Sequence, residues 1–188
     1  TLEYKGFAFN TWANLDTDPE DGDAGLNETD LTFSYDTSKG PLGLGAGFIY
    51  YGLDSADDSQ EFYVQIDYDT LLTPTLIIYK DIKSFPGYYL NLGLSHSLSI
   101  TDSIVLSLSG ALGYYISNDD DVVDKGTNDR YRGLQDGLLT ASLSIPLTKY
   151  FTLTPTMSYA FPLSSRAEDS LGITSGEVFG GLTLSLLF

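Results

Sequence analysis

The chain has 188 residues, which fits one domain, and its 26 Asp or Glu outweigh 9 Lys or Arg, giving a formal net charge of −17. The basic residues are scattered, so no phosphate-binding stripe exists and we expect no nucleic-acid partner. Cysteine is absent, which excludes disulfides and thiolate chemistry. No apolar run is long enough for a transmembrane helix. The N-terminal segment lacks a basic region followed by an apolar core, so we read the sequence as a mature chain.

Apolar residues recur with a period of two along the whole chain, and Pro, Gly, Asn, Asp and Ser gather between the alternating segments. This pattern predicts ten strands, at 4–15, 27–37, 42–53, 60–70, 74–82, 88–100, 103–117, 135–146, 151–162 and 176–188. Counts of eight or twelve strands stay open at this point.

Most of these strands have one apolar face and one face of small or polar residues. In the last strand the apolar face reads Val178, Gly180, Leu182, Leu184, Leu186 and Phe188, against Gly181, Thr183 and Ser185. Small polar residues suit the inside of a narrow barrel, whereas the polar face of a soluble sheet would carry many charges. The sequence therefore predicts an all-β fold, a closed antiparallel transmembrane β-barrel of about ten strands. A soluble sandwich or a lipocalin-like barrel is the alternative.

The connections between strands alternate in length. Short ones fall near 38–41, 71–73, 101–102 and 147–150, and longer ones, mostly acidic, at 16–26, 54–59, 118–134 and 163–175; only 84–87 is short on the long-loop side. Outer-membrane barrels have short periplasmic turns and longer extracellular loops, and an even strand number puts both termini in the periplasm. We therefore expect location in the bacterial outer membrane, with both termini periplasmic.

Aromatic residues gather near both ends of the predicted strands. Those at the long-loop end are Tyr50, Phe62, Tyr79, Tyr88, Tyr114, Tyr159 and Phe161; those at the other end are Tyr68, Phe151 and Phe188. Girdles of this kind lie at headgroup depth, so we expect contact with membrane lipids and lipopolysaccharide. The general preference of strands for Tyr and Phe is the alternative explanation.

The last strand, apolar at every second position from Val178 to a terminal Phe188, resembles the C-terminal signature of Gram-negative outer-membrane β-barrels. That resemblance implies the barrel assembly machinery as a partner during biogenesis, with Phe188 as the assembly signal. A second resemblance, to small porin-like barrels including the TorF-like type, is carried by residues 61–63, 69–75, Tyr79, Asp81, Gly87, Tyr88, His96, 153–155 and 159–164. The C-terminal resemblance covers one strand directly and the whole chain in architecture, and it implies no particular activity.

Carboxylates on the predicted inward faces are the first candidate site: Glu28, Asp30, Asp36, Glu61, Asp67, Asp69 and Asp136. A negative interior favours cations, and ten strands leave at most a narrow passage. We therefore expect a porin or channel that passes cations or small solutes by passive diffusion. The glycines at 43, 45 and 47 either widen this passage or relieve crowding.

A plugged barrel, whose lumen is closed to solutes, is the alternative. Lys80, Lys83, Arg130 and Arg132 would then pair with the carboxylates as a plug, and the acidic loops would serve a structural, adhesive or subunit role with an unidentified protein partner. The alternation in 74–82 leaves the orientation of Lys80 open, and loop 118–133 either caps the mouth or extends into solvent.

The first long loop is a second candidate site, for Ca²⁺ bound weakly, through Asp16, Asp18, Glu20, Asp21 and Asp23. The resemblance to an EF-hand loop is incomplete because Gly22 comes one residue late and Asn27 stands where a carboxylate is needed. A solvated acidic loop is the alternative, and we predict no other cofactor.

We do not expect an enzyme. The only histidine, His96, falls on the apolar face with Leu92 and Leu94, whereas Ser95 and Ser97 lie on the opposite face, so the local sequence forms no nucleophile and base pair.

Overall fold

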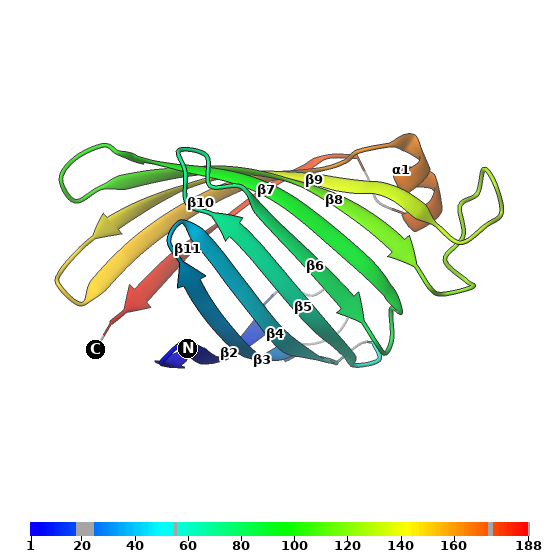
Figure 1. Ribbon diagram of the computed structural model, residues 1–188, viewed down its shortest axis with the longest axis horizontal. Helices are drawn as coiled ribbons and strands as arrows, with labels where there is room; N and C mark the ends of the chain where they lie inside the picture. Colours follow the sequence, from blue (N-terminus) through cyan, green and yellow to red (C-terminus); the bar gives the residue numbers. More distant parts are fainter. Residues whose placement is uncertain (18–24, 55, 173–174, 188) are drawn as a thin grey trace.

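The described chain forms one antiparallel sheet in a computed structural model, which describes residues 1–17, 25–54, 56–172 and 175–187 (Figure 1). The strands follow one another in chain order, each paired with the next. They are β1 (Leu2–Tyr4), β2 (Phe7–Asp16), β3 (Gly25–Lys39), β4 (Leu42–Leu53), β5 (Ser59–Tyr68), β6 (Thr75–Asp81), β7 (Gly87–Ser99), β8 (Val105–Ser117), β9 (Arg132–Pro146), β10 (Phe151–Pro162) and β11 (Glu177–Leu186). Among the described residues, no helix is both long and apolar enough to cross a membrane.

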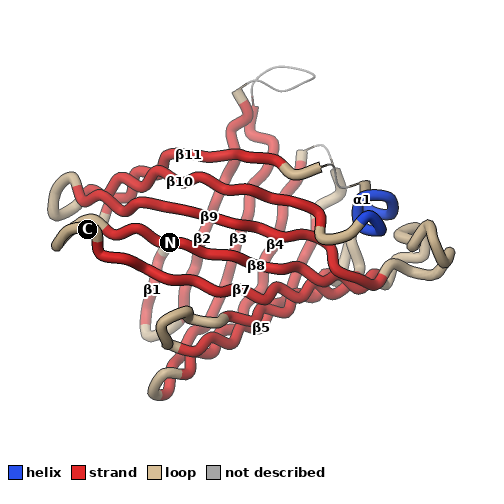
Figure 2. The backbone as a smooth tube through the Cα atoms, turned by 90° about the horizontal axis from the view of Figure 1, so that it is seen from above, coloured by secondary structure: helices blue, strands red, loops and turns tan. Residues whose placement is uncertain are grey.

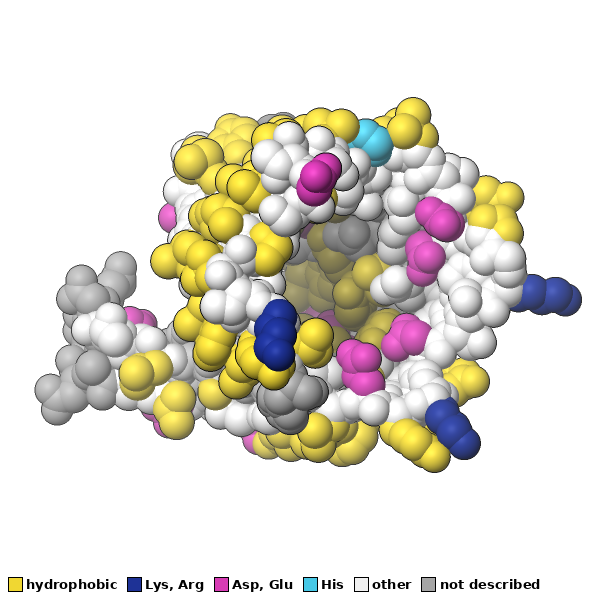
Figure 3. Space-filling model, turned by 90° about the vertical axis from the view of Figure 1, so that its left-hand side faces the viewer, with side chains coloured by type: hydrophobic (Ala, Val, Ile, Leu, Met, Phe, Trp, Pro, Cys, Tyr) yellow, Lys and Arg dark blue, Asp and Glu magenta, His cyan; other side chains and the backbone are white. Residues whose placement is uncertain are grey.

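The sheet curls around a hollow interior. Figure 2 shows β2, β3 and β4 passing beneath β7 to β11, and Figure 3 looks into the hollow from the end where the short turns and both termini lie. The predicted closure is not found, because β11 pairs only with β10 in the described chain. A physical obstacle stands at the seam. The edge of β2 that would receive β11 is occupied at Phe7, Ala8 and Phe9 by β1.

The strand count is eleven rather than ten, because the predicted strand 4–15 is interrupted by a tight turn. Lys5 and Gly6 both have positive φ, 49° and 87°, as a two-residue hairpin turn requires. A Cβ at residue 6 would lie 2.5 Å from the Asp36 carbonyl oxygen, and the Asp36 amide donates to the Gly6 carbonyl at 2.8 Å. Gly6 was the available signal for this turn.

The other nine predicted strands are confirmed, with ends within three residues of those observed and identical bounds for β4 and β10. The predicted loop 163–175 instead contains a short helix, α1 (Ser165–Leu171). Its ends are set by the Ser164 side chain, which accepts from the Ala167 amide, and by Gly172 in the left-handed conformation.

The two faces of the sheet differ in chemistry. On β5, the outward face carries Phe62, Val64 and Ile66, each about half exposed, and the inward face alternates with them as Glu61, Tyr63, Gln65 and Asp67. Large apolar side chains are exposed in this way on nearly every strand, whereas Tyr131 and Ala167 are the only buried apolar residues in the described part of the chain. The fold thus has an apolar outer wall in place of a core.

Inward-facing glycines make room for larger side chains on neighbouring strands. A Cβ at Gly43 would collide with the Asp67 carboxylate, one at Gly45 with Asp36, and one at Gly47 with the Tyr63 ring. Of the two roles considered for these glycines, the structure supports relief of crowding, because the neighbouring side chains fill the space they leave.

Gly47→Ala is therefore expected to destabilise the protein by about 1–3 kcal/mol, the usual range for overpacking, because the Tyr63 ring must move. Gly181→Ala is the matched control, since Gly181 also faces inward but has nothing within 4 Å of its added Cβ. Urea unfolding of the refolded protein, followed through the fluorescence of its single tryptophan, measures the difference. Equal effects of the two substitutions would contradict this account.

Candidate functional site

Strand register gathers the inward polar residues into two groups. At the short-turn end, Asp36 and Asp67 cover Gly45 and Gly43. Toward the long loops, a row of tyrosines crosses β5 to β8, and Glu61 and Asp81 lie directly opposite each other in the next row. The row comprises Tyr63, Tyr79, Tyr89 and Tyr115. Its ring centroids are 5.7 Å apart for Tyr63 and Tyr79 and 6.2 Å apart for Tyr79 and Tyr89.

Hydrogen bonds fix the carboxylates of the second group. The Tyr51 hydroxyl donates to Glu61 Oε2 at 2.8 Å, and the Tyr89 hydroxyl donates to the Asp136 carboxylate at 3.0 Å. A β-bulge in β9 places Asp136 there, because Gln135 and Asp136 together oppose Gly113 of β8. These bonds leave Glu61 and Asp136 with oxygen lone pairs available for a ligand.

Asp81 plays a different role from Glu61. Its carboxylate is buried, accepts from the Ser59 hydroxyl at 2.5 Å, and accepts from the backbone amides of Lys83 and Phe85 at 2.8 and 3.3 Å. Asp81 therefore holds the 82–86 turn and places Phe85 at the mouth.

Sequence reasoning did not select Asp81 or the tyrosine row as site residues. Strand β6 carries apolar residues on both faces, with Ile77 inward and Leu76 and Ile78 outward, which hides its alternation. Tyr79, which we expected in the outer aromatic girdle, instead faces inward between Tyr63 and Tyr89.

The remaining predicted carboxylates divide between interior and turn. Glu28 and Asp30 lie on the inward face of β3, and Asp30 Oδ1 is buried without a hydrogen-bond partner. Asp69 was predicted on the strand 60–70 but lies beyond its end, because β5 ends at Tyr68 and Asp69 is in the following turn, where its amide donates to the Pro41 carbonyl at 2.7 Å. The pairing between β5 and β6 ends at Asp67 and Thr75, so the turn begins before Asp69.

Basic residues stay out of the interior. The three on described strands, Lys39, Lys80 and Arg132, all lie on outward positions. Lys80 Nζ sits 4.2 Å from the centroid of the Tyr88 ring, which resolves its orientation. The described ion pairs, Arg130 with Asp120 and Arg166 with Asp124, involve no inward carboxylate. The salt-bridged plug considered above is therefore not formed by the described residues.

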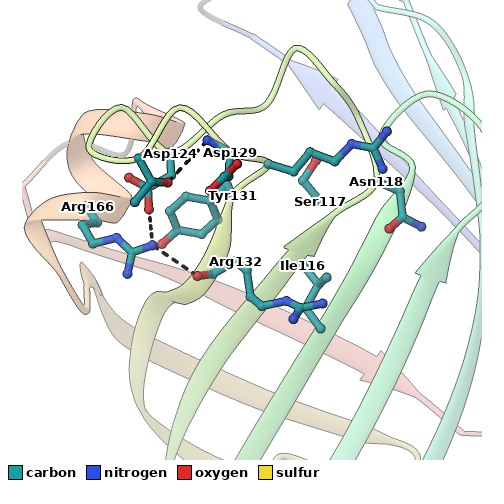
Figure 4. Close-up of a pocket in the computed structure, with 10 residues that line it drawn as sticks. Ile116, Ser117, Asn118, Asp124, Asp129, Tyr131, Arg132 and Arg166 are labelled. Carbon is teal, nitrogen blue, oxygen red and sulfur yellow. Dashed lines mark hydrogen bonds and ion pairs between the residues drawn. The ribbon is translucent and has the colours of Figure 1, made fainter.

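The long loop 118–131 docks onto α1 (Figure 4). Asp124 is fully buried there, accepts from the Gly126 amide at 2.8 Å, and pairs with Arg166. Tyr131, also buried, donates its hydroxyl to the Leu134 carbonyl at 2.7 Å. This loop is thus an anchored part of the mouth rather than a free segment.

The docking should depend on pH. The Gly126 amide, and after it the Arg166 guanidinium, lowers the pKa of Asp124. A lowered pKa stabilises the docked loop above the ordinary aspartate pKa of about 3.9, and that stabilisation is lost as pH falls through the lowered value. We expect the hydrogen-exchange protection factors of the Gly126 and Tyr131 amides, which are corrected for the intrinsic pH dependence of exchange, to fall below about pH 4. Asp124→Asn should show low protection of these amides at every pH, and a variant that kept the wild-type pH profile of protection would contradict the assignment.

The predicted calcium loop falls mostly outside the described residues, as do Asp18, Glu20, Asp21, Asp23 and the predicted assembly residue Phe188. Asp16 ends β2, paired with Gly25. In the described ranges, no group of three or more His, Cys, Asp or Glu side chains is placed to hold a metal ion.

His96 faces outward with Leu92 and Leu94, as the alternation predicts. Its Nδ1 lies 2.6 Å from the Leu71 carbonyl oxygen, so the ring ties β7 to the neighbouring turn. Neither Ser95 nor Ser97 shares its face.

No protein-family model matches the chain, and no curated protein is significantly similar to it.

Proposed function

We propose that the protein is a small β-barrel of the bacterial outer membrane that gives cations or small solutes a narrow passage by passive diffusion. The observation that carries the proposal is the division of charge: described strands present carboxylates inward and their basic residues outward. Because Coulomb interactions strengthen where little water is present, an interior whose charged side chains on the described strands are all negative would attract cations and repel anions.

The outer wall supports a membrane location. Exposed Leu, Phe, Val and Ile on nearly every strand would be costly in water and favourable in hydrocarbon, at about 25 cal/mol per Å². Lys80 over Tyr88 at the long-loop end fits headgroup depth. Lipids and lipopolysaccharide would then surround the wall, and the barrel assembly machinery would insert it.

The proposal includes closure of the sheet. Strands β2 and β11 run antiparallel, so direct pairing between them yields a ten-stranded barrel and places both termini at the short-turn end, the periplasmic side. β1 pairs with β2 only at Phe7, Ala8 and Phe9, so the proposed pairing with β11 would use later residues of β2, 10–15.

A plugged barrel, whose lumen is closed to solutes, is the second candidate, and the covering of the long-loop mouth favours it. Val122 of the docked loop and Leu171 of α1 reach the same cavity as Glu61. Such a barrel would act through its acidic loops, in a structural, adhesive or subunit role.

Single-channel recording in a planar bilayer separates the two candidates. Stable openings, with a reversal potential that shows cation preference across a KCl gradient, would support the passage. If protein whose folding is confirmed by heat-modifiable electrophoresis gave no channel openings, the plugged barrel would be favoured. A preference for anions would overturn the proposed mechanism.

A further inference from the structure

A cavity of about 480 Å³ opens on the inward face at the long-loop end. Its walls combine carboxylates, aromatic rings and an amide: Glu61, Asp81, Phe85, Tyr89, Tyr115 and Gln135. The volume lies within the range of small-molecule sites.

The charge balance of this cavity calls for a cation. Glu61 and Asp81 are directly opposite each other on β5 and β6, an arrangement of like charges that is destabilising and that a bound cation would relieve. Among the described residues no lysine or arginine forms an ion pair with either carboxylate. Three donors already occupy the Asp81 carboxylate, whereas Glu61 accepts one hydrogen bond, from Tyr51, so Glu61 has the greater remaining capacity to receive a ligand.

The other walls show what kind of cation fits. Phe85, Tyr89 and Tyr115 present aromatic rings, and Val122 and Leu171 add apolar contact. Aromatic faces attract ammonium and guanidinium groups through cation–π interactions, and apolar walls favour a ligand with a hydrocarbon body. Divalent cations such as Ca²⁺ take six or more oxygen ligands, and the described part of the chain has no group of three or more His, Cys, Asp or Glu side chains placed to hold a metal ion. Gln135 supplies a further acceptor, Oε1, which has no donor in this structure.

We infer that this cavity binds an organic cation, a primary ammonium or guanidinium group on an apolar body, with Glu61 as its counter-ion and Phe85 and Tyr89 as its aromatic walls. The inference names the solute class of the proposed passage and takes its biological meaning from that function. Binding itself does not require conduction, so the two can fail separately.

Calorimetric titration of phenethylammonium into the refolded protein in detergent micelles tests this inference, with empty micelles as the blank. One-site binding is expected, with 2-phenylethanol, the uncharged analogue, binding at least about tenfold more weakly because it lacks the charge-assisted bond to Glu61. Potassium chloride added at the ionic strength of the amine solution should not displace the bound amine.

Two variants and one control locate the site. Glu61→Gln should weaken binding about tenfold or more. Phe85→Ala, a change in an exposed turn, should weaken it severalfold without disturbing the strands. Asp67→Asn removes the same interior charge at the short-turn end and should leave affinity within about twofold.

The inference is overturned if the amine gives no heat above empty micelles, if 2-phenylethanol binds equally well, or if Asp67→Asn weakens binding as much as Glu61→Gln. A barrel that conducts but does not bind the amine would refute the site and leave the passage standing. One that binds without conducting would refute the passage alone.

Discussion

The double variant Glu61→Gln, Asp136→Asn is expected to lose most of the cation preference of the conducting protein, bringing the permeability ratio of potassium to chloride close to about one. Both carboxylates lie on the inward face near the tyrosine row, where they would line the proposed passage. Because the energy between two charges rises as their separation and the local dielectric constant fall, these charges would act on an ion that passes close to them. Reversal potentials across a KCl gradient measure the change.

The matched control removes two charges from outside the interior. Asp102 and Asp121 are exposed, in a short turn and a long loop, and lie beyond the strands. Because the Debye length is about 10 Å at 0.1 M salt, amides at these two positions should alter selectivity little, and less still at 1 M. If the control variant changed selectivity as much as the interior variant, selectivity would arise from the mouth and the assignment of the inward carboxylates would fail.

Alternation alone located most of the fold. A period of two places strands well wherever one face is uniformly apolar, as in β8, where Leu106, Leu108 and Leu112 share the outward face. It also assigns faces, so Asp30, Asp67 and Asp136 were found from spacing.

Alternation failed where both faces look alike or where a turn is brief. In β6 both faces carry isoleucine, so Lys80 was ambiguous and Tyr79 was assigned to the wrong face. The turn at Lys5 and Gly6 is two residues long, too short to interrupt the apparent pattern. Helix α1 is a single short element defined by its caps, which strand periodicity ignores.

The site depends on register, which the sequence does not reveal. Glu61 and Asp81 are twenty residues apart in number and meet only because β5 and β6 pair at that offset. Likewise Tyr89 reaches Asp136 across Gly113, since glycine leaves the inward face of β8 open between them. No local motif encodes either contact.

Closure of the barrel between β11 and β2 can be tested with disulfides introduced across the seam. Because the chain has no cysteine, a disulfide across the seam would be unambiguous. Ala13 on β2 and Val178, Gly180 and Leu182 on β11 all point outward. Ala13→Cys combined in turn with Val178→Cys, Gly180→Cys or Leu182→Cys should give one pair that oxidises within the folded monomer, since side chains directly opposite in an antiparallel pair lie within disulfide reach.

That pair also reports the register of closure. A monomer that keeps its fast electrophoretic mobility after brief heating, and loses this resistance when reductant is added, would show β11 joined to β2. Ala13→Cys with Leu108→Cys, on β8, is the control, because β8 is separated from β2 by five strands along the sheet. If all three seam pairs gave only intermolecular disulfides, as the control should, β11 would be a free edge in solution. The passage would then lack a complete wall, and the free edge of β11 would need a strand from a partner chain rather than β2 of its own chain.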